Sequence, residues 1–329
     1  MLQDFDNRHV QYESKTMERT MSINSVYMSI VEQHLKQCAI CDHVEMIGSV
    51  YEGLATDEAD SIQFEALITM PISGSDIEVI KMSDKPFYVW LKFLHGAEPS
   101  PVFDRVLNYW SFFGSWLGER YLDSKKTVDL IFKGMEKCIF ESKHLNGKVK
   151  LNRKGAVLQM EVYPDSWLLS WGSRLYSVDI IPAYTVGQEV YESRPIRGDK
   201  MPDTMTWHRS FALQERQKLC EGAKMVLRVL KALRKRESDF GNFTSYQLKT
   251  VVLHETDANE DWSELMLGKR LADVLTRLER CLAARNIPHY FSPEINLLSK
   301  MPPYAMDYLG DRIRHLRTNE DEIVRLLKI

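Results

Sequence analysis

The chain has 329 residues, 44% of them hydrophobic, which is enough to bury a large core in one large or two fused domains. A net charge of −3 gives no global signal for nucleic acid or a charged membrane surface, and no apolar run approaches the roughly 18 residues of a membrane span. The five scattered cysteines are typical of free thiols in a reducing compartment. Cys38, Cys41 and His43 have no second pair at zinc-finger spacing, so no metal site is predicted there.

The first half of the chain mixes helices and strands. Apolar residues at helical spacing predict one long amphipathic helix over residues 9–37. Alternating polar and apolar residues then predict strands at about 43–48, 61–70, 77–82 and 87–94. The aromatic-rich segment 105–120 is predicted to be helical, and Ser124 is predicted to cap a helix over 125–143.

The second half changes from strands to helices. Val, Ile and Tyr are frequent in 156–164 and 174–184, which predicts two strands, and the composition changes at a Pro/Gly-bearing crossing, 194–204. Beyond it the helical pattern covers 209–237, 244–256, 262–286 and 303–327, with a loop between the last two. The order predicts an α+β fold with a mixed sheet lobe (1–203), a C-terminal helical lobe (204–329) and ligands in a cleft between them.

The stretch "EMIGSVYEGLATDEADSIQFEALITM" (45–70) combines a turn with an alternating strand. A glycine at position 48 lets a phosphate approach backbone N–H groups, and the Ser49 hydroxyl can add a hydrogen bond. In the strand that follows, Ser61, Gln63 and Glu65 point to one face. This pattern suits the wall of a phosphate site, although taken alone it favours a plain turn beside a half-exposed strand.

Asp179 lies within the otherwise apolar run "SVDIIPAY". An uncompensated carboxylate is costly to bury, so this side chain should face a polar cleft or pair with a cation. Two-metal nucleotidyl transfer uses three carboxylates around two Mg²⁺ ions. The chain offers Asp179 and Glu65, whereas Ser61 and Gln63 are neutral and cannot supply the charge that holds the metal.

The helical lobe adds further polar candidates. His208, Arg209 and Ser210 come together just before a predicted helix. Tyr246 can stack on a base or lie in the core. The later candidates for ligand contact are Lys231, Ser245 and Tyr246.

In chain order, "GSVYEGL", "VDIIPAY", "WHRSF", "LKALRK", "TSYQLKTVVLHE", "DWSELMLGKRL" and "PHYFSPEINLL" resemble the Mab-21 family of nucleotidyltransferase-fold proteins, to which cyclic GMP-AMP synthase belongs. The similarity runs from about residue 10 to the last helix, and it implies a bilobal nucleotidyltransferase fold. Synthases of the family carry an acid-x-acid pair at the places that read Ser61 and Gln63 here. A two-residue insertion would instead align Gln63 and Glu65, which leaves one acid.

"ADSIQ", "LDSKKTVDLIF" and "NEDWSELML" further resemble the non-catalytic mitochondrial dynamics proteins, which are receptors for a dynamin-related fission GTPase. That branch binds ADP or GDP in the old active-site cleft and needs no metal cofactor. The resemblance implies a cytosol-facing pseudoenzyme at the mitochondrial outer membrane, anchored by a segment absent from this chain, and it leaves room for a homodimer. Glu65 and Asp179 would be relics of catalysis. The nucleotide contacts it implies are Gly48, Ser49, Ser61, Gln63, Asp179, His208, Arg209, Ser210, Lys231, Ser245 and Tyr246.

Two alternatives stay open. An active synthase-type enzyme would use Glu65 and Asp179 as Mg²⁺ ligands and make a cyclic dinucleotide, unless Gln63 was introduced to silence it. A Mab-21-type scaffold with a closed or vacant cleft would bind no nucleotide. The zinc-bearing insertion of the DNA-sensing synthase is missing between Arg209 and Lys231, so binding of double-stranded DNA is not expected.

Overall fold

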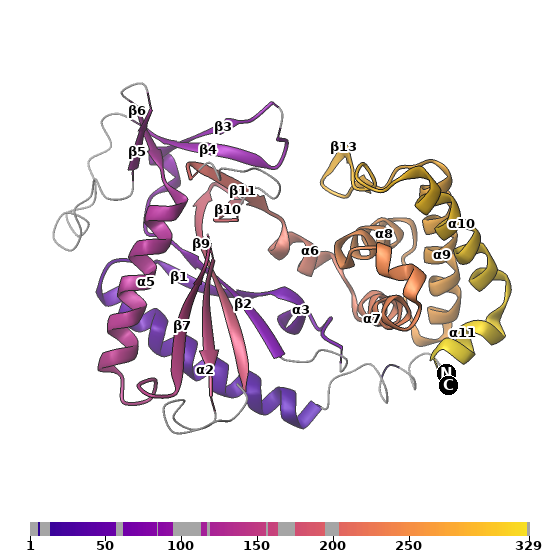
Figure 1. Ribbon diagram of the computed structural model, residues 1–329, viewed down its shortest axis with the longest axis horizontal. Coiled ribbons are helices and arrows are strands. Elements are labelled where there is room, and N and C mark those ends of the chain that lie inside the picture. The colour runs from indigo at the N-terminus through magenta and orange to yellow at the C-terminus, as the bar shows by residue number, and fades with distance from the viewer. Residues whose placement is uncertain are drawn as a thin grey trace. The chain divides into compact units, whose positions relative to one another are not determined.

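The computed structural model describes residue 6 and residues 14–56, 62–83, 85–94, 113–116, 119–155, 157–163, 175–194 and 204–327. The chain forms two compact units (Figure 1). The sheet unit comprises Met17–Tyr51 and Asp60–Phe211, and the helical unit comprises Met1–Thr16, Glu52–Ala59 and Ala212–Ile329. The division after Phe211 falls later than the one expected after residue 203, because the last strand of the sheet lies between them.

The sheet unit contains two long helices and a large mixed sheet (Figure 1). Its elements are α2 (Ser14–Gln37), β1 (His43–Ile47), α3 (Gly48–Tyr51), β2 (Ile62–Thr69), η2 (Gly74–Asp76), β3 (Ile77–Lys81), β4 (Tyr88–Phe93), β5 (Phe113–Trp116), β6 (Glu119–Leu122), α5 (Ser124–Glu141), β7 (Val149–Lys154), β8 (Val157–Val162), β9 (Tyr176–Val186), β10 (Glu189–Glu192) and β11 (Thr206–Ser210).

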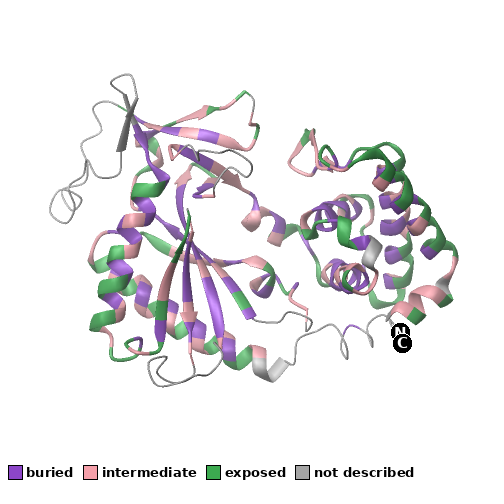
Figure 2. Ribbon diagram, in the orientation of Figure 1, coloured by how far each residue is buried: buried purple, intermediate pink, exposed green. Residues whose placement is uncertain are grey.

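The strands follow the order β1-β2-β9-β10-β11-β4-β6-β5, with β3 paired to β4 and the β7–β8 hairpin paired to β9. β2 and β9 run parallel, so side chains at equivalent positions of the two strands emerge on the same face. α2 and α5 pack closely, because a Cβ atom at Gly134 of α5 would come within 2.8 Å of Leu35 and Ile40. The buried faces of both helices and of the central strands form the core of this unit (Figure 2).

Several predictions for the sheet unit are wrong. The segment 105–120 is not helical where it is described, since it forms β5 and part of β6; aromatic residues also favour strands. α5 is capped by Asp123, which accepts a hydrogen bond from the Lys126 backbone N–H, and not by Ser124. His208, Arg209 and Ser210 lie just before a helix, as expected, but they belong to β11, and the helix predicted from residue 209 begins at Ala212.

The helical unit packs its helices around one apolar cluster. Its elements are α6 (Ala212–Lys218), α7 (Glu221–Arg236), η4 (Ser238–Asn242), α8 (Ser245–Ala258), η5 (Glu264–Met266), α9 (Leu267–Ala283), β12 (Pro288–His289), β13 (Ser292–Asn296), α10 (Pro303–Thr318) and α11 (Glu320–Leu327). The predicted helices at 209–237 and 303–327 are each broken in two, and the loop before α10 contains a short hairpin. Among the described residues, no helix is both long and apolar enough to cross a membrane.

Residues from upstream of α6 complete the helical unit. Arg228 of α7 is buried, and its Nε donates to Asp6 Oδ1 at 2.8 Å. The same guanidinium donates through Nη1 to the Gly53 carbonyl at 2.6 Å. α7 also packs tightly at its start, since a Cβ at Gly222 would lie 2.1 Å from the Trp262 carbonyl oxygen.

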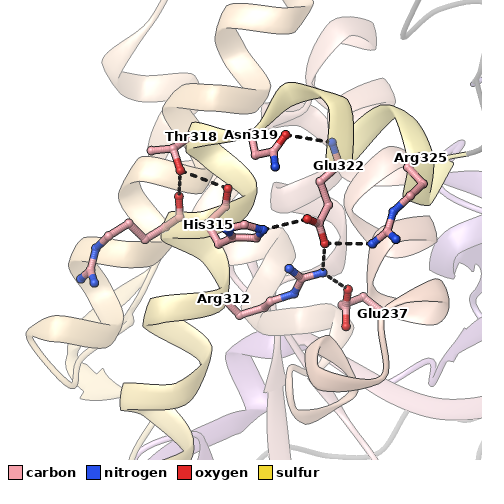
Figure 3. A network of polar contacts seen from close by, with 8 residues as sticks. Glu237, Arg312, His315, Thr318, Asn319, Glu322 and Arg325 are labelled. Atoms are coloured by element: carbon pink, nitrogen blue, oxygen red, sulfur yellow. Dashed lines mark hydrogen bonds and ion pairs between the residues drawn. The ribbon is translucent and has the colours of Figure 1, made fainter.

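A polar network holds α11 against the preceding helices (Figure 3). Arg312 of α10 donates to Glu237 Oε2 and to Glu322 Oε1, both at 2.5 Å. His315 Nε2 lies 2.7 Å from Glu322 Oε2. The hydrogen bonds from Arg312 and His315 lower the pKa of Glu322 to about 2. The contribution of ionised Glu322 to stability is therefore complete above pH 4.5, the ordinary pKa of a glutamate. This contribution is lost as the pH falls through about 2, where Glu322 is protonated in the folded chain.

Replacing Arg312 by alanine should lower the melting temperature by a few degrees, because Glu237 and Glu322 both lose their shared cation. Differential scanning calorimetry measures the change. Arg314→Ala is the matched control on the same helix, since Arg314 is half-exposed and pairs with Glu279 and Asp311 at the surface. An equal effect of both substitutions would contradict a special role of the network.

Candidate functional site

The predicted Gly-Ser turn lies directly against the strand that carries Glu65. Gly48 follows β1 with a φ of +82°, a backbone conformation that favours glycine. A Cβ atom at this position would lie 3.2 Å from the Cβ, Cγ and Cδ atoms of Glu65. Ser49 is exposed beside it. The glycine is thus required both by its φ and by the close approach of the Glu65 side chain.

Asp179 lies at the centre of a polar row that crosses three strands. It has a register partner on each neighbouring strand: Glu65 on the parallel strand β2 and Gln159 on the antiparallel strand β8. All three side chains therefore share a face of the sheet. Gln63 Nε2 donates to Asp179 Oδ2 at 2.6 Å, and Gln159 Nε2 donates to Oδ1 at 2.9 Å. Both oxygens of Asp179 are therefore bonded to side-chain amides. Ser61, which was predicted to lie on the same face, is outside the described residues.

Arg194, just after β10, supplies the cation of this cluster. Its Nη2 donates to Glu65 Oε2 at 3.0 Å, and its Nε lies 2.7 Å from Glu192 Oε1. Burial lowers the pKa of Arg194, but the charges of Glu192, Glu65 and Asp179 outweigh it and raise the pKa above its ordinary value. The guanidinium is therefore held in its charged form by three carboxylates.

Glu192 is the buried member of the cluster, with a side chain that is 4% exposed. Its Oε1 lies 3.1 Å from His208 Nδ1. Burial alone would raise the pKa of Glu192, but the hydrogen bond with His208 and the charge of Arg194 bring the pKa below its ordinary value. Glu192 thus stays ionised and fixes the position of both partners.

The three residues predicted to act together on β11 do not share a face. His208 and Ser210 both interact with Glu192. Arg209 points to the other face of the strand, where it pairs with Glu189 and lies over the Phe211 ring at 4.9 Å. β11 alternates as every strand does, so only His208 and Ser210 belong to the polar cluster of the sheet unit.

A second polar cluster lies within the helical unit. Lys249 of α8 is 9% exposed, and its Nζ lies 2.6 Å from Glu52 Oε2 and 2.7 Å from Glu215 Oε2. Tyr246 donates its hydroxyl to Glu215 Oε1 at 2.9 Å and lies 2.7 Å from His289 Nε2. The tyrosine is engaged in this internal network, so base stacking by Tyr246 stays a prediction.

Lys231 of α7 is the one predicted phosphate ligand of this unit with a strongly shifted pKa. Its Nζ donates to the Leu54 carbonyl at 2.9 Å. Burial lowers the pKa of Lys231 to about 8, and the nearby charges of Lys249 and Arg234 act in the same direction. Ser245, the first residue of α8, is exposed and accepts a hydrogen bond from Arg234 at 2.6 Å. The hydrogen-bond partner of the Lys231 amine is thus a backbone carbonyl, and no described carboxylate lies at ion-pair distance from it.

Comparison with known proteins gives matches in both parts of the chain. Residues 222–315 match the Mab-21 protein HhH/H2TH-like domain. Over 307 residues the chain is 28% identical to a cyclic GMP-AMP synthase-like receptor 3 from Stylophora pistillata, which covers 87% of this chain and 83% of that protein. It is 29% identical over 130 residues to Protein male abnormal 21 from Caenorhabditis elegans, which covers 38% of this chain and 36% of that protein. Residues 222–315 thus match a Mab-21-type domain, and the chain as a whole is similar to proteins of the Mab-21/cyclic GMP-AMP synthase-like family.

This Mab-21-like protein has the mixed sheet and the helical C-terminal region of a nucleotidyltransferase-like fold. Its residues do not fit the two-metal centre implied by the family's synthases. Asp179 has both oxygens bonded to amides, and Glu65 is paired with Arg194. Gln63 is neutral and presents its amide N–H group to Asp179, so it does not replace the missing carboxylate.

The sequence reasoning missed three members of the sheet-unit cluster, namely Gln159, Glu192 and Arg194. Glu192 and Arg194 are spaced by two residues, which hints that they share a side of the chain, but no local pattern connects either of them to Glu65. Gln159 would have been found from the pairing of β8 with β9, which needs the register of the sheet.

Proposed function

We propose that this chain is a pseudo-nucleotidyltransferase that binds ADP or GDP without a metal ion. The observation that supports it best is the bonding of Asp179 to the neutral amides of Gln63 and Gln159. A site whose carboxylates are already bonded to neutral amides and paired with a guanidinium repels a diphosphate less and has less free charge with which to hold Mg²⁺. Glu65 and Asp179 are then relics that serve as hydrogen-bond acceptors.

The proposed ligand contacts follow from chemistry and from the family resemblance. The backbone after Gly48 and the exposed Ser49 hydroxyl are donors suited to phosphate oxygens. Lys231 is a partly buried amine that has no carboxylate at ion-pair distance within the described parts of the chain, and a phosphate would compensate its charge. The family resemblance further implies contacts at Ser61, Gln63, Asp179, His208, Ser210, Ser245 and Tyr246. Arg209 is left out of the proposal, because it lies on the opposite face of β11 and pairs with Glu189.

Thermal-shift measurements with ADP and GDP test the proposal directly. At a concentration of about 100 times its dissociation constant, a nucleotide adds roughly 2.7 kcal/mol to stability, which raises the melting temperature by several degrees. We expect the same rise with Mg²⁺ and with EDTA. A rise that needs Mg²⁺ would contradict metal-independent binding, and no rise with any nucleotide would favour a scaffold with a closed cleft.

The cellular part of the proposal is a receptor role at the mitochondrial outer membrane. It rests on the resemblance of "ADSIQ" and "LDSKKTVDLIF" to the mitochondrial dynamics proteins. A dynamin-related GTPase is the partner it implies, recruited in an ADP- or GDP-dependent manner. Co-sedimentation of this chain with the assembled GTPase, with and without nucleotide, checks the interaction; no co-sedimentation in either condition would contradict it.

Synthesis of a cyclic dinucleotide is the second candidate function. It is favoured by the 28% identity to a cyclic GMP-AMP synthase-like receptor along 87% of this chain. The chain would be incubated with the four nucleoside triphosphates, Mg²⁺ or Mn²⁺ and candidate activating RNAs, and the products separated by chromatography. A cyclic dinucleotide above background, lost in Asp179→Asn, would replace the pseudoenzyme proposal.

A further inference from the structure

The guanidinium of Arg194 in the sheet unit interacts with several carboxylates. Arg194 contacts Glu65 through Nη2 at 3.0 Å and Glu192 through Nε at 2.7 Å. Asp179 adds its charge to the same group. The cluster therefore contains three acids and one basic side chain that is charged at every physiological pH.

The arrangement of the strands requires such a cation. Glu65 and Asp179 are register partners on the parallel strands β2 and β9, so the two carboxylates emerge side by side on one face. Like charges at neighbouring strand positions are destabilising unless an opposite charge or hydrogen-bond donors compensate them. Gln63 and Gln159 donate hydrogen bonds to the two oxygens of Asp179, and Arg194 donates one to Glu65.

We propose that Arg194 is the built-in counter-cation of this site and takes over the charge-balancing role of a divalent ion at Glu65 and Asp179, which it thereby excludes. This inference deepens the proposed metal-independent nucleotide binding, on which its functional meaning rests. The side chain is suited to the role, because one guanidinium donates a hydrogen bond to Glu65 and forms an ion pair with Glu192. Buried Glu192 fixes one edge of it and leaves the other for Glu65.

Two substitutions separate the guanidinium from the net charge of the cluster. Arg194→Gln leaves Glu65 and Asp179 without a permanent cation, while Glu192 keeps its contact with His208. Gln63→Glu adds one carboxylate and keeps Arg194, so the cluster reaches the same formal charge by the other route. Arg194→Lys keeps the positive charge. The three variants differ from wild type at described positions of one cluster.

The measurement is the binding of Mn²⁺ to the full, nucleotide-free chain, followed by the electron paramagnetic resonance signal of free Mn²⁺. We expect Arg194→Gln to bind Mn²⁺ roughly tenfold or more tightly than wild type, and Arg194→Lys to resemble wild type. Gln63→Glu should gain less than Arg194→Gln, because Arg194 still pairs with Glu65. Adding Asp179→Asn to Arg194→Gln should abolish the gain.

Four results would overturn the inference: tight Mn²⁺ binding by wild type, no gain in folded Arg194→Gln, an equal or larger gain in Gln63→Glu, or a gain that survives Asp179→Asn. Circular dichroism shows whether each variant folds. Should Arg194→Gln fail to fold, the pair Arg194→Gln with Glu192→Gln replaces it, since the buried carboxylate left without its cation is then neutral. The assay contains no nucleotide, so its failure is distinct from a failure of ADP or GDP binding.

Discussion

Substituting Lys249 by methionine should lower the free energy of unfolding by about 3–5 kcal/mol, a large part of the total stability of a domain. Lys249 is buried between Glu52 and Glu215, whose side chains are 6% and 5% exposed. Methionine fills a similar volume, so the loss comes from two carboxylates left in the interior without a cation. Urea unfolding followed by circular dichroism measures the change.

Lys224→Met is the matched control for this substitution. Lys224 lies on α7 of the same unit and pairs with exposed Glu221 at 3.5 Å, so its loss should cost less than about 1 kcal/mol. The triple variant Lys249→Met, Glu52→Gln, Glu215→Gln should regain most of the stability, because the two carboxylates that lost their cation are replaced by neutral amides. A Lys249→Met protein as stable as the control would mean that the carboxylates are not buried charges.

Removing the Lys231 amine should weaken the binding of ADP or GDP about 10- to 100-fold, since a charge-assisted hydrogen bond contributes about 1.5–3 kcal/mol. This expectation rests on the proposed function. Isothermal titration calorimetry of Lys231→Ala gives the dissociation constant. Lys235→Ala, one turn further along α7 and exposed, is the control and should bind as wild type does. Equal affinities of all three proteins would show that Lys231 does not meet the phosphates.

The same lysine predicts the pH dependence of binding and of stability. Burial lowers the pKa of Lys231 to about 8 in the folded chain from an ordinary 10.5. Affinity for a diphosphate should fall as the pH rises above about 8, because binding must then take up a proton. The stability of the nucleotide-free chain should rise between about pH 8 and 10.5, where only the unfolded state still holds that proton. Lys231→Arg, which stays charged, should show neither trend.

The sequence predicted the parts of the fold that depend on local periodicity. The long helix α2, the strands β1 to β4 and the helices α8 and α9 lie close to the expected positions, because their apolar residues recur at one clear period. The sequence does not indicate strands at β5 and β11, since short aromatic and polar stretches favour neither period. Their strand conformation comes from pairing with β6 and β10 in the sheet.

The candidate site was only half predictable for a similar reason. Asp179 was expected to need polar or cationic partners, and it has two amides and the charge of Arg194. Which residues supply them depends on contacts between distant segments: Arg194 lies 129 positions after Glu65. Arg209 was grouped with its neighbours along the chain, but strand alternation sends it to the opposite face.

Three separate stretches of polypeptide build the helical unit, and two of its interior cations depend on the early ones. Arg228 donates to Asp6, and Lys249 pairs with Glu52; both acids lie well upstream of Ala212. A C-terminal fragment excised at that point would carry both side chains into its interior with those acids missing. We therefore expect such a fragment to aggregate or fold only partly, and to regain cooperative melting when the upstream peptides are supplied in trans.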